Sequence, residues 1–214
     1  MMEFLKTIID LFLHIDKNLV VIVAKFGAFS YALLFVVIFM ETGLVVTPFL
    51  PGDSLLFAAG ALAAMGSMNI WLLYGLMFLA AFLGDTANYW IGHKLGRGVF
   101  ETGNKFFKKE YLDEAESFYA KHGGAAIFLG RFVPIVRTFV PFVAGVSEMS
   151  YKHFIAYNLI GGLTWVTLFL WGGYLFGNIP FVKENFHYVV IVIVLISVVP
   201  IVWTALKKKK KAKN

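Results

Sequence analysis

Five ionisable side chains lie within or at the mouth of strongly apolar stretches of this chain, and they are Glu41, Asp53, Asp85, Arg131 and Arg137. On insertion scales, such a group costs about 2.5–3.5 kcal/mol at the centre of a bilayer, so it is a candidate for function. Arginine keeps its charge at physiological pH, and its planar fork suits bidentate binding of phosphate. Arg131 and Arg137 are therefore candidates to bind one anionic headgroup.

The three acids suggest a second kind of chemistry. Burial away from water favours the protonated form of a carboxylic acid, so such a group can bind and release protons near neutral pH. Glu41, Asp53 and Asp85 are thus candidate sites for coupling transport to protons. The alternative is structural: Glu41 or Asp53 pairs with one of the two arginines and only pins two segments together, since buried charges are normally paired.

Composition places these residues in a membrane protein. Of the 214 residues, 59% are hydrophobic and 15% are charged, against about 45–50% and about 25% in soluble domains. The absence of cysteine excludes disulfides, thiol nucleophiles and cysteine-bound metals. The metal motif HExxH, the nucleophile elbow GxSxG and the phosphate loop GxxxxGK[ST] are also missing. We therefore expect one integral membrane domain over 1–214 that is not an enzyme and has no metal or cofactor.

Four apolar stretches are long enough to cross about 30 Å of hydrocarbon. The predicted spans are 28–46, 69–92, 152–176 and 186–206.

Two other apolar segments, 47–66 and 124–146, contain helix-breaking residues. The first contains Pro48, Pro51 and Gly52, and the second contains Pro134, Pro141 and Gly145. An internal proline removes a backbone hydrogen bond and clashes with the preceding turn, and irregular backbone at membrane depth must be buried in protein or line a watery cavity. Both segments are predicted to be re-entrant, broken helices.

The basic residues predict the topology. The segment 94–122 is polar and rich in lysine, and 207–214 carries a run of lysines directly after an apolar span. Because cytoplasmic loops are enriched in Lys and Arg, both termini are predicted to be cytoplasmic. The tail is expected to contact anionic phospholipids rather than nucleic acid. The segment 1–27 lacks the features of a cleaved signal peptide and is predicted to be an amphipathic interfacial helix or a short re-entering helix.

This topology makes the two halves inverted copies, each with a re-entrant segment followed by a spanning helix. Two weak sequence matches support it. Pro48, Phe49 and Gly52 align with Pro141, Phe142 and Gly145, and the segment 92–96 resembles 173–177, but the two alignments require offsets that differ by twelve residues. Paired Gly/Pro-interrupted segments in two halves are typical of transporter binding sites.

Other polar and aromatic residues have more than one interpretation. Asp85, Asn88 and Tyr89 can share one helix face, either as a polar packing seam with the neighbouring glycines or as part of a substrate path. His93 is interpreted as interfacial rather than as a proton relay. The tryptophans mostly lie near the ends of spans and are interpreted as interfacial anchors; they are Trp71, Trp90, Trp165, Trp171 and Trp203.

Three segments together resemble the DedA family of bacterial inner-membrane proteins. They are ETGLVVTPFLPGDSLL from Glu41, GDTANYWIG from Gly84 and GRFVPIVRTFVPFVAG from Gly130. The resemblance runs from about residue 10 to residue 206. It implies a fold with two opposed re-entrant helices, shared with eukaryotic lipid scramblases of the broader superfamily, and a location in the bacterial cytoplasmic membrane.

The resemblance also implies a function. Some members are associated with returning undecaprenyl phosphate across the membrane, in dependence on the proton motive force. The essential acids of the family map onto Glu41 and Asp53 and its arginines onto Arg131 and Arg137, whereas Asp85 belongs to a more variable part of the pattern. We expect a flippase for a lipid phosphate. A proton/cation antiporter and a non-transporting assembly factor are the alternatives, and a homo-oligomer is compatible with each.

Overall fold

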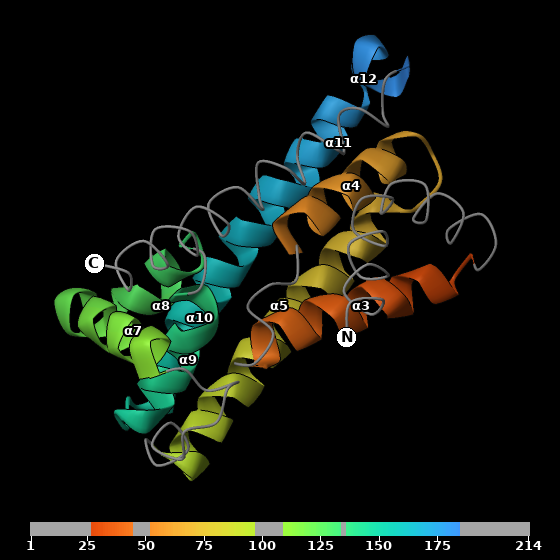
Figure 1. Cartoon of the computed structure of the whole chain (residues 1–214). Helices are drawn as coiled ribbons and strands as arrows, with labels where there is room; N and C mark the ends of the chain where they lie inside the picture. Colours follow the sequence, from red (N-terminus) through yellow and green to blue (C-terminus); the bar gives the residue numbers. More distant parts are fainter. Residues whose placement is uncertain (1–26, 45–51, 97–108, 134–135, 185–214) are drawn as a thin grey trace, which may run out of the picture. The chain divides into compact units, whose positions relative to one another are not determined.

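The computed structural model describes residues 27–44, 52–96, 109–133 and 136–184, and the regular elements in these ranges are all helical (Figure 1). The chain divides into two compact units. The described part of the first unit is 27–34, 52–74 and 168–184, and that of the second is 35–44, 75–96, 109–133 and 136–167. The predictions for 1–26, 186–206 and 207–214 lie outside the described residues, as do Pro48, Pro51 and Pro134.

Among the described residues, two helices are long and apolar enough to cross a membrane. The first is α5, Ile70–Leu95, and the second runs from Tyr151 to Gly177. They confirm the predicted spans 69–92 and 152–176 to within a few residues. The second contains α10 (Tyr151–Val166), a π-helical stretch at Thr167–Trp171 and α11 (Gly172–Gly177). The predicted span 28–46 appears as α3, Phe29–Gly43, which is shorter than expected.

The boundaries of α5 follow from local hydrogen bonding. The side-chain oxygen of Asn69 accepts hydrogen bonds from the backbone N–H groups of Trp71 and Leu72, both at 3.0 Å, which is the usual N-cap arrangement. At the other end, the N–H of Gly96 donates to the carbonyl of Gly92, and Gly96 has a φ of 62°. A left-handed residue after the last turn ends a helix, and glycine adopts that conformation without steric cost.

The two proline-containing segments form short helices. The described part of 47–66 contains α4, Gly52–Ala64, and 124–146 contains α8, Ala125–Gly130, and α9, Val136–Val146. The second segment is therefore broken, as predicted, between Gly130 and Val136. Pro141, however, lies inside α9 and does not break it. Pro141 is the sixth of the eleven residues of α9, so the helix lacks the hydrogen bond that a backbone N–H at this position would donate to the carbonyl of Arg137.

In the first unit, α4 packs closely against α11 and the π-helical stretch. A Cβ atom built at Gly60 would overlap the carbonyl of Leu170 and approach the backbone N of Tyr174, and one built at Gly173 would overlap the carbonyl of Phe57. Only glycine allows two helix backbones to approach this closely. Ten of the thirteen residues of α4 are buried, so the helix is enclosed on most sides.

In the second unit, α9 packs against the C-terminal half of α5 in the same way. A Cβ atom at Gly92 would overlap the carbonyl of Phe142, and one at Gly145 would overlap the carbonyl of Tyr89 and approach the backbone N of His93. Gly145, predicted to belong to a re-entrant backbone, is thus a packing residue near the end of α9. It brings α9 against α5 one turn beyond the buried polar residues of α5.

Helix α7, Lys109–His122, confirms the helix predicted within the linker 94–122. It packs on α9 and α8, and its residues Leu112 and Ala115 enter the hydrophobic core of the second unit. The amphipathic pattern of α7 therefore buries one face and leaves Asp113 and Glu114 exposed on the other.

Candidate functional site

Arg131 lies at the break between α8 and α9. It is the residue directly after α8, and its side chain is only 4% exposed. A Cβ atom at Gly161 would come within 3.1 Å of the Arg131 Cδ and 3.2 Å of its Nε, and one at Gly162 would lie 3.6 Å from Nη2. The two adjacent glycines of α10 thus leave the space that the arginine side chain fills.

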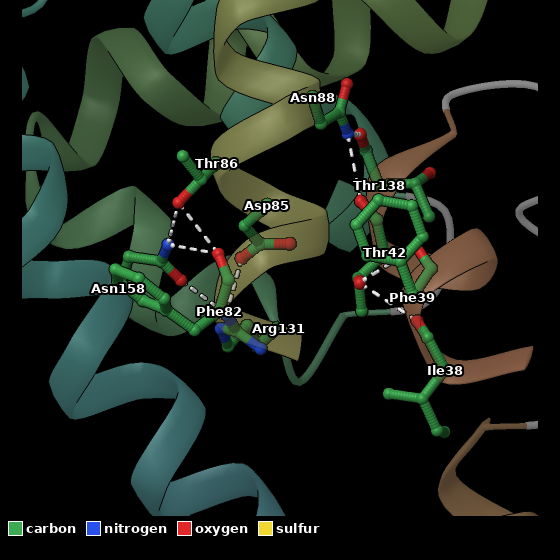
Figure 2. A network of polar contacts seen from close by, with 10 residues as sticks. All are labelled: Ile38, Phe39, Thr42, Phe82, Asp85, Thr86, Asn88, Arg131, Thr138 and Asn158. Carbon is green, nitrogen blue, oxygen red and sulfur yellow. Dashed lines mark hydrogen bonds and ion pairs between the residues drawn. The ribbon is translucent and has the colours of Figure 1, made fainter. Parts of the chain in front are cut away.

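Arg131 binds two side chains at its Nη2 atom (Figure 2). It forms an ion pair of 2.5 Å with the Oδ2 of Asp85 and donates a hydrogen bond of 2.6 Å to the Oδ1 of Asn158. The Nδ2 of Asn158 donates in turn to the carbonyl of Phe82, at 3.2 Å, and contacts the Oγ1 of Thr86 at 3.4 Å. Asn158 therefore orients the arginine while its own amide is anchored on α5.

This first ion pair is deeply buried. The side chains of Arg131 and Asp85 are 4% and 3% exposed, and the Nε of Arg131 has no hydrogen-bond partner among the described residues. Removing one partner from a pair of this kind leaves an uncompensated buried charge. Arg131 is thus fixed by α5 and α10.

A second ion pair joins α3 to α9. The Nη2 of Arg137 lies 3.2 Å from the Oε1 of Glu41, and the side chains are 11% and 3% exposed. The guanidinium of Arg137 also lies over the ring of Trp165, with its carbon 4.6 Å from the ring centroid. This is the geometry of a cation–π interaction. Of the two arginines, Arg137 is the more accessible.

Asn88 connects the helices that carry the second pair. Its Nδ2 donates to the carbonyls of Thr42 and Thr138, at 3.2 and 2.6 Å (Figure 2). These threonines directly follow Glu41 and Arg137 in the sequence. Asn88 is fully buried, and its Oδ1 has no hydrogen-bond partner among the described residues. One amide on α5 thus fixes the backbones of α3 and α9 beside the ion pair.

The predicted polar seam on α5 is present. Asp85, Asn88 and Tyr89 are all buried, and the hydroxyl of Tyr89 donates a hydrogen bond of 2.5 Å to the carbonyl of Met149. Next to them, a Cβ atom at Gly84 would overlap the hydroxyl of Thr42. The residues therefore form a packing seam, as the structural interpretation expected. Asp85 in this seam belongs to the first ion pair, and Asn88 lies beside the second.

Asp53 and Gly52 belong to the first unit. They form the start of α4, where Gly52 is buried and Asp53 is half-buried in the first turn. A carboxylate in that place complements the positive end of the helix dipole. The proton-coupling role of Asp53 stays a prediction.

Two contributors to the site were not found from the sequence. Trp165 is fully buried under Arg137, so its interpretation as an interfacial anchor is wrong, whereas Trp71 and Trp90 are 67% and 42% exposed. Asn158 binds Arg131 but was not singled out. The available signal was that it is the single asparagine in the predicted span 152–176, three residues before Gly161.

The site therefore contains two acids and two arginines, each arginine paired with its own acid. Arg131 interacts electrostatically with the other three charged residues, and Asp85 also interacts with Arg137. The four formal charges sum to zero. In the described part of the chain, no three His, Cys, Asp or Glu residues are grouped as a metal site requires. In such an arrangement, another anion can take the place of the carboxylate beside an arginine. A carboxylate that loses its arginine can be neutralised by a proton.

Comparison with known proteins gives the family of the chain. The VTT domain family matches residues 50–175. The chain is 50% identical to the protein DedA of Escherichia coli K12 over 99% of its own length and 98% of that protein. An uncharacterized membrane protein of Mycobacterium leprae is 42% identical over 81% of the chain and 80% of its own length.

A more distant relative is the inner membrane protein YghB of Salmonella typhimurium. It is 38% identical over 72% of the chain and 71% of its own length. No solved structure matches the chain. The VTT domain, the long identity to DedA and the membrane relatives agree with the buried charges on apolar helices: the chain is a membrane protein of the DedA family, close to DedA.

Proposed function

We propose that this protein moves a lipid phosphate, with undecaprenyl phosphate as the expected substrate, between the leaflets of the bacterial cytoplasmic membrane. The observation that carries the proposal is the ion pair of Arg137 and Glu41, buried between apolar helices next to a second buried pair. Charges cost too much in a membrane to be kept without a reason. The protein performs no covalent chemistry in this proposal, and the phosphate leaves as it entered.

Arg137 is the proposed headgroup ligand. It is the less buried of the two arginines, and a guanidinium on an aromatic face keeps an edge for bidentate contact with phosphate. Arg131 is held by Asp85 and Asn158, so in this proposal it contributes charge to the site without leaving its partners. Glu41 exchanges the proton, and Asp53 and Asp85 remain candidates for further proton binding.

The glycine contacts within the two units support an internal repeat. The residues of the α5 contact have counterparts 81 positions later in the second long helix, and those of α4 have counterparts 85 positions later in α9. The pairs are Tyr89 and Leu170, Gly92 and Gly173, His93 and Tyr174 in the long helices, and Phe57 and Phe142, Gly60 and Gly145 in the short ones.

This register differs from the sequence match in the short helices. It keeps the equivalence of Gly92 and Gly173, but it pairs Gly145 with Gly60 instead of Gly52. The two offsets now differ by four residues, about one helical turn, instead of twelve. Repeats of a short and a long helix are the architecture on which alternating access is built.

The test is leaflet-resolved transport of undecaprenyl phosphate in proteoliposomes. We expect Arg137→Ala to abolish transport in a protein that folds, because the headgroup loses its ligand. The matched control is Lys152→Ala, which removes an equal charge from the exposed start of α10 and should leave transport unchanged. Unaltered transport by Arg137→Ala would refute the assignment. Ion flux without lipid movement would favour a cation antiporter instead.

A further inference from the structure

We propose that the exposed end of α5 and the exposed start of α10 form a docking surface for anionic phospholipids of the surrounding membrane. Both helix ends belong to the second unit. The lipid held there surrounds the protein and is not the substrate, so the inference does not depend on the proposed function. This surface, called the basic patch below, consists of Trp90, His93, Lys94, Tyr151, Lys152 and His153.

Aromatic contacts bring the two helix ends together. The ring centroid of Trp90 on α5 lies 5.3 Å from that of Tyr151 on α10, and the ring of Tyr89 lies 5.6 Å from the same tyrosine. The imidazole of His93 packs on both Tyr89 and Trp90. The residues next to these rings on the two helices are therefore presented at one place on the second unit.

Two lysines supply the permanent positive charge of the basic patch. Lys94 lies one turn beyond Trp90 and so shares its side of α5, and Lys152 directly follows Tyr151. Both lysines are exposed, and in the described part of the chain neither forms an ion pair with an acid. Their charges are therefore available to a negatively charged headgroup.

The acids near the basic patch do not cancel this charge. Among residues 90–96 and 147–154 the single acid is Glu148, in the exposed turn before α10. It offsets one lysine, so one positive charge is left over even while both histidines are neutral. On the neighbouring helix α7, Asp113 and Glu114 lie on the exposed face and not on the face that packs on α8 and α9.

The apolar neighbours of the lysines favour a lipid over a soluble anion as the occupant. Trp90 and Leu95 are 42% and 51% exposed, on a helix that is long and apolar enough to cross a membrane. Tryptophan is enriched at the level of the headgroups, where its amphipathic ring borders both hydrocarbon and water. A lysine one turn further along the same helix then lies at the depth of the lipid phosphates.

The opposite end of α5 has the exposed apolar side chains without the charge. Trp71 and Leu72 are 67% and 51% exposed, and residues 66–74 include no charged side chain. A lysine close to an anionic membrane surface strengthens attachment by about fivefold. The end with Lys94 should therefore select anionic over zwitterionic lipid, whereas the end with Trp71 should not.

The test identifies the lipid next to each end of α5. Because the chain has no cysteine, a bimane fluorophore can be attached to Leu95→Cys beside the basic patch or, as the matched control, to Leu72→Cys. The two leucines are equally exposed on the same helix. The full chain is reconstituted in vesicles with equal amounts of phosphatidylcholine and phosphatidylglycerol, one of which carries bromine on its acyl chains. Quenching by each brominated lipid measures how often that lipid lies beside the label.

We expect the label at Leu95→Cys to prefer phosphatidylglycerol by about fivefold, and the label at Leu72→Cys to show no preference. Adding Lys94→Gln and Lys152→Gln should remove the preference at Leu95→Cys, and Glu148→Gln should increase it. Since these side chains are exposed, the substitutions should hardly change stability, which circular dichroism checks.

The contrast between the two labels decides the proposal even if a lysine variant does not fold. Equal quenching by the two lipids at Leu95→Cys would overturn it, and so would an equal preference for phosphatidylglycerol at Leu72→Cys. A preference that persists in the folded double lysine variant would assign the lipid to other cations and refute the basic patch.

Discussion

At the scale of single residues, the two arginines have different surroundings although they lie six positions apart. Arg131 is enclosed by α5 and α10, bound to Asp85 and Asn158, and cradled by two glycines. Arg137 is less buried and rests on Trp165. The sequence predicted that both are functional but could not distinguish them, because the distinction depends on side chains from distant helices.

The buried pair of Arg131 and Asp85 leads to a prediction about stability. Asp85→Leu leaves the arginine without its counter-charge and should lower the free energy of unfolding by about 3–5 kcal/mol. The double variant Asp85→Leu with Arg131→Met removes both charges and should recover most of that loss. Unfolding in detergent, followed by circular dichroism, measures both values.

The control for this pair is Asp113→Leu, which removes a carboxylate from the exposed face of α7 and should change stability little. If the double variant were less stable than Asp85→Leu alone, the pair would not be a compensated unit. Its role as the fixed pair of the site would then be wrong.

At the scale of elements, the sequence predicted which segments are helical but not how they touch. The long apolar runs gave the two long helices to within a few residues, and the prolines correctly indicated a break after Gly130. Pro141 lies in the middle of α9 and the helix continues past it, so its role in a re-entrant backbone stays a prediction. The sequence match of Gly52 with Gly145 stays a prediction, whereas the glycine contacts favour Gly60 as the counterpart of Gly145, because close helix contacts depend on three-dimensional packing.

Helix α5 offers an internal comparison of two glycines. A Cβ atom at Gly92 would overlap the carbonyl of Phe142, whereas one at Gly75 meets nothing within 4 Å. Gly75→Ala should therefore raise the thermal midpoint slightly, since alanine favours a helix by about 0.5–1 kcal/mol. Gly92→Ala should lower stability by about 1–3 kcal/mol, because α9 must move away.

The thermal midpoint in detergent distinguishes the two glycine variants, and transport activity should fall only for Gly92→Ala. Equal behaviour of both variants would show that α9 does not depend on this close approach. The inferred equivalence of the two units would then lose its main support.

At the scale of the whole molecule, the topology remains a prediction from the distribution of lysines. Because the chain has no cysteine, single cysteines can be introduced without a background. Ser67→Cys and Lys121→Cys place thiols on exposed positions that the prediction assigns to opposite sides of the membrane.

A membrane-impermeant maleimide should label Ser67→Cys in intact cells and Lys121→Cys only after the membrane is opened. Labelling of both in intact cells would contradict a cytoplasmic linker at 94–122. The reverse pattern would show that the protein has the opposite orientation in the membrane. The two proline-containing segments would then enter from the leaflets opposite to those predicted.

The length of α5 has a consequence for the membrane itself. At about 1.5 Å per residue, its 26 residues extend about 39 Å, against about 30 Å of hydrocarbon. Helix α5 must therefore tilt, or project its last turn with His93 and Lys94 among the headgroups. Since it carries Asp85 and Asn88, a thicker or thinner bilayer would change its inclination and strain the two helices bound to Asn88. The thickness of the bilayer should therefore affect the geometry of the charged site.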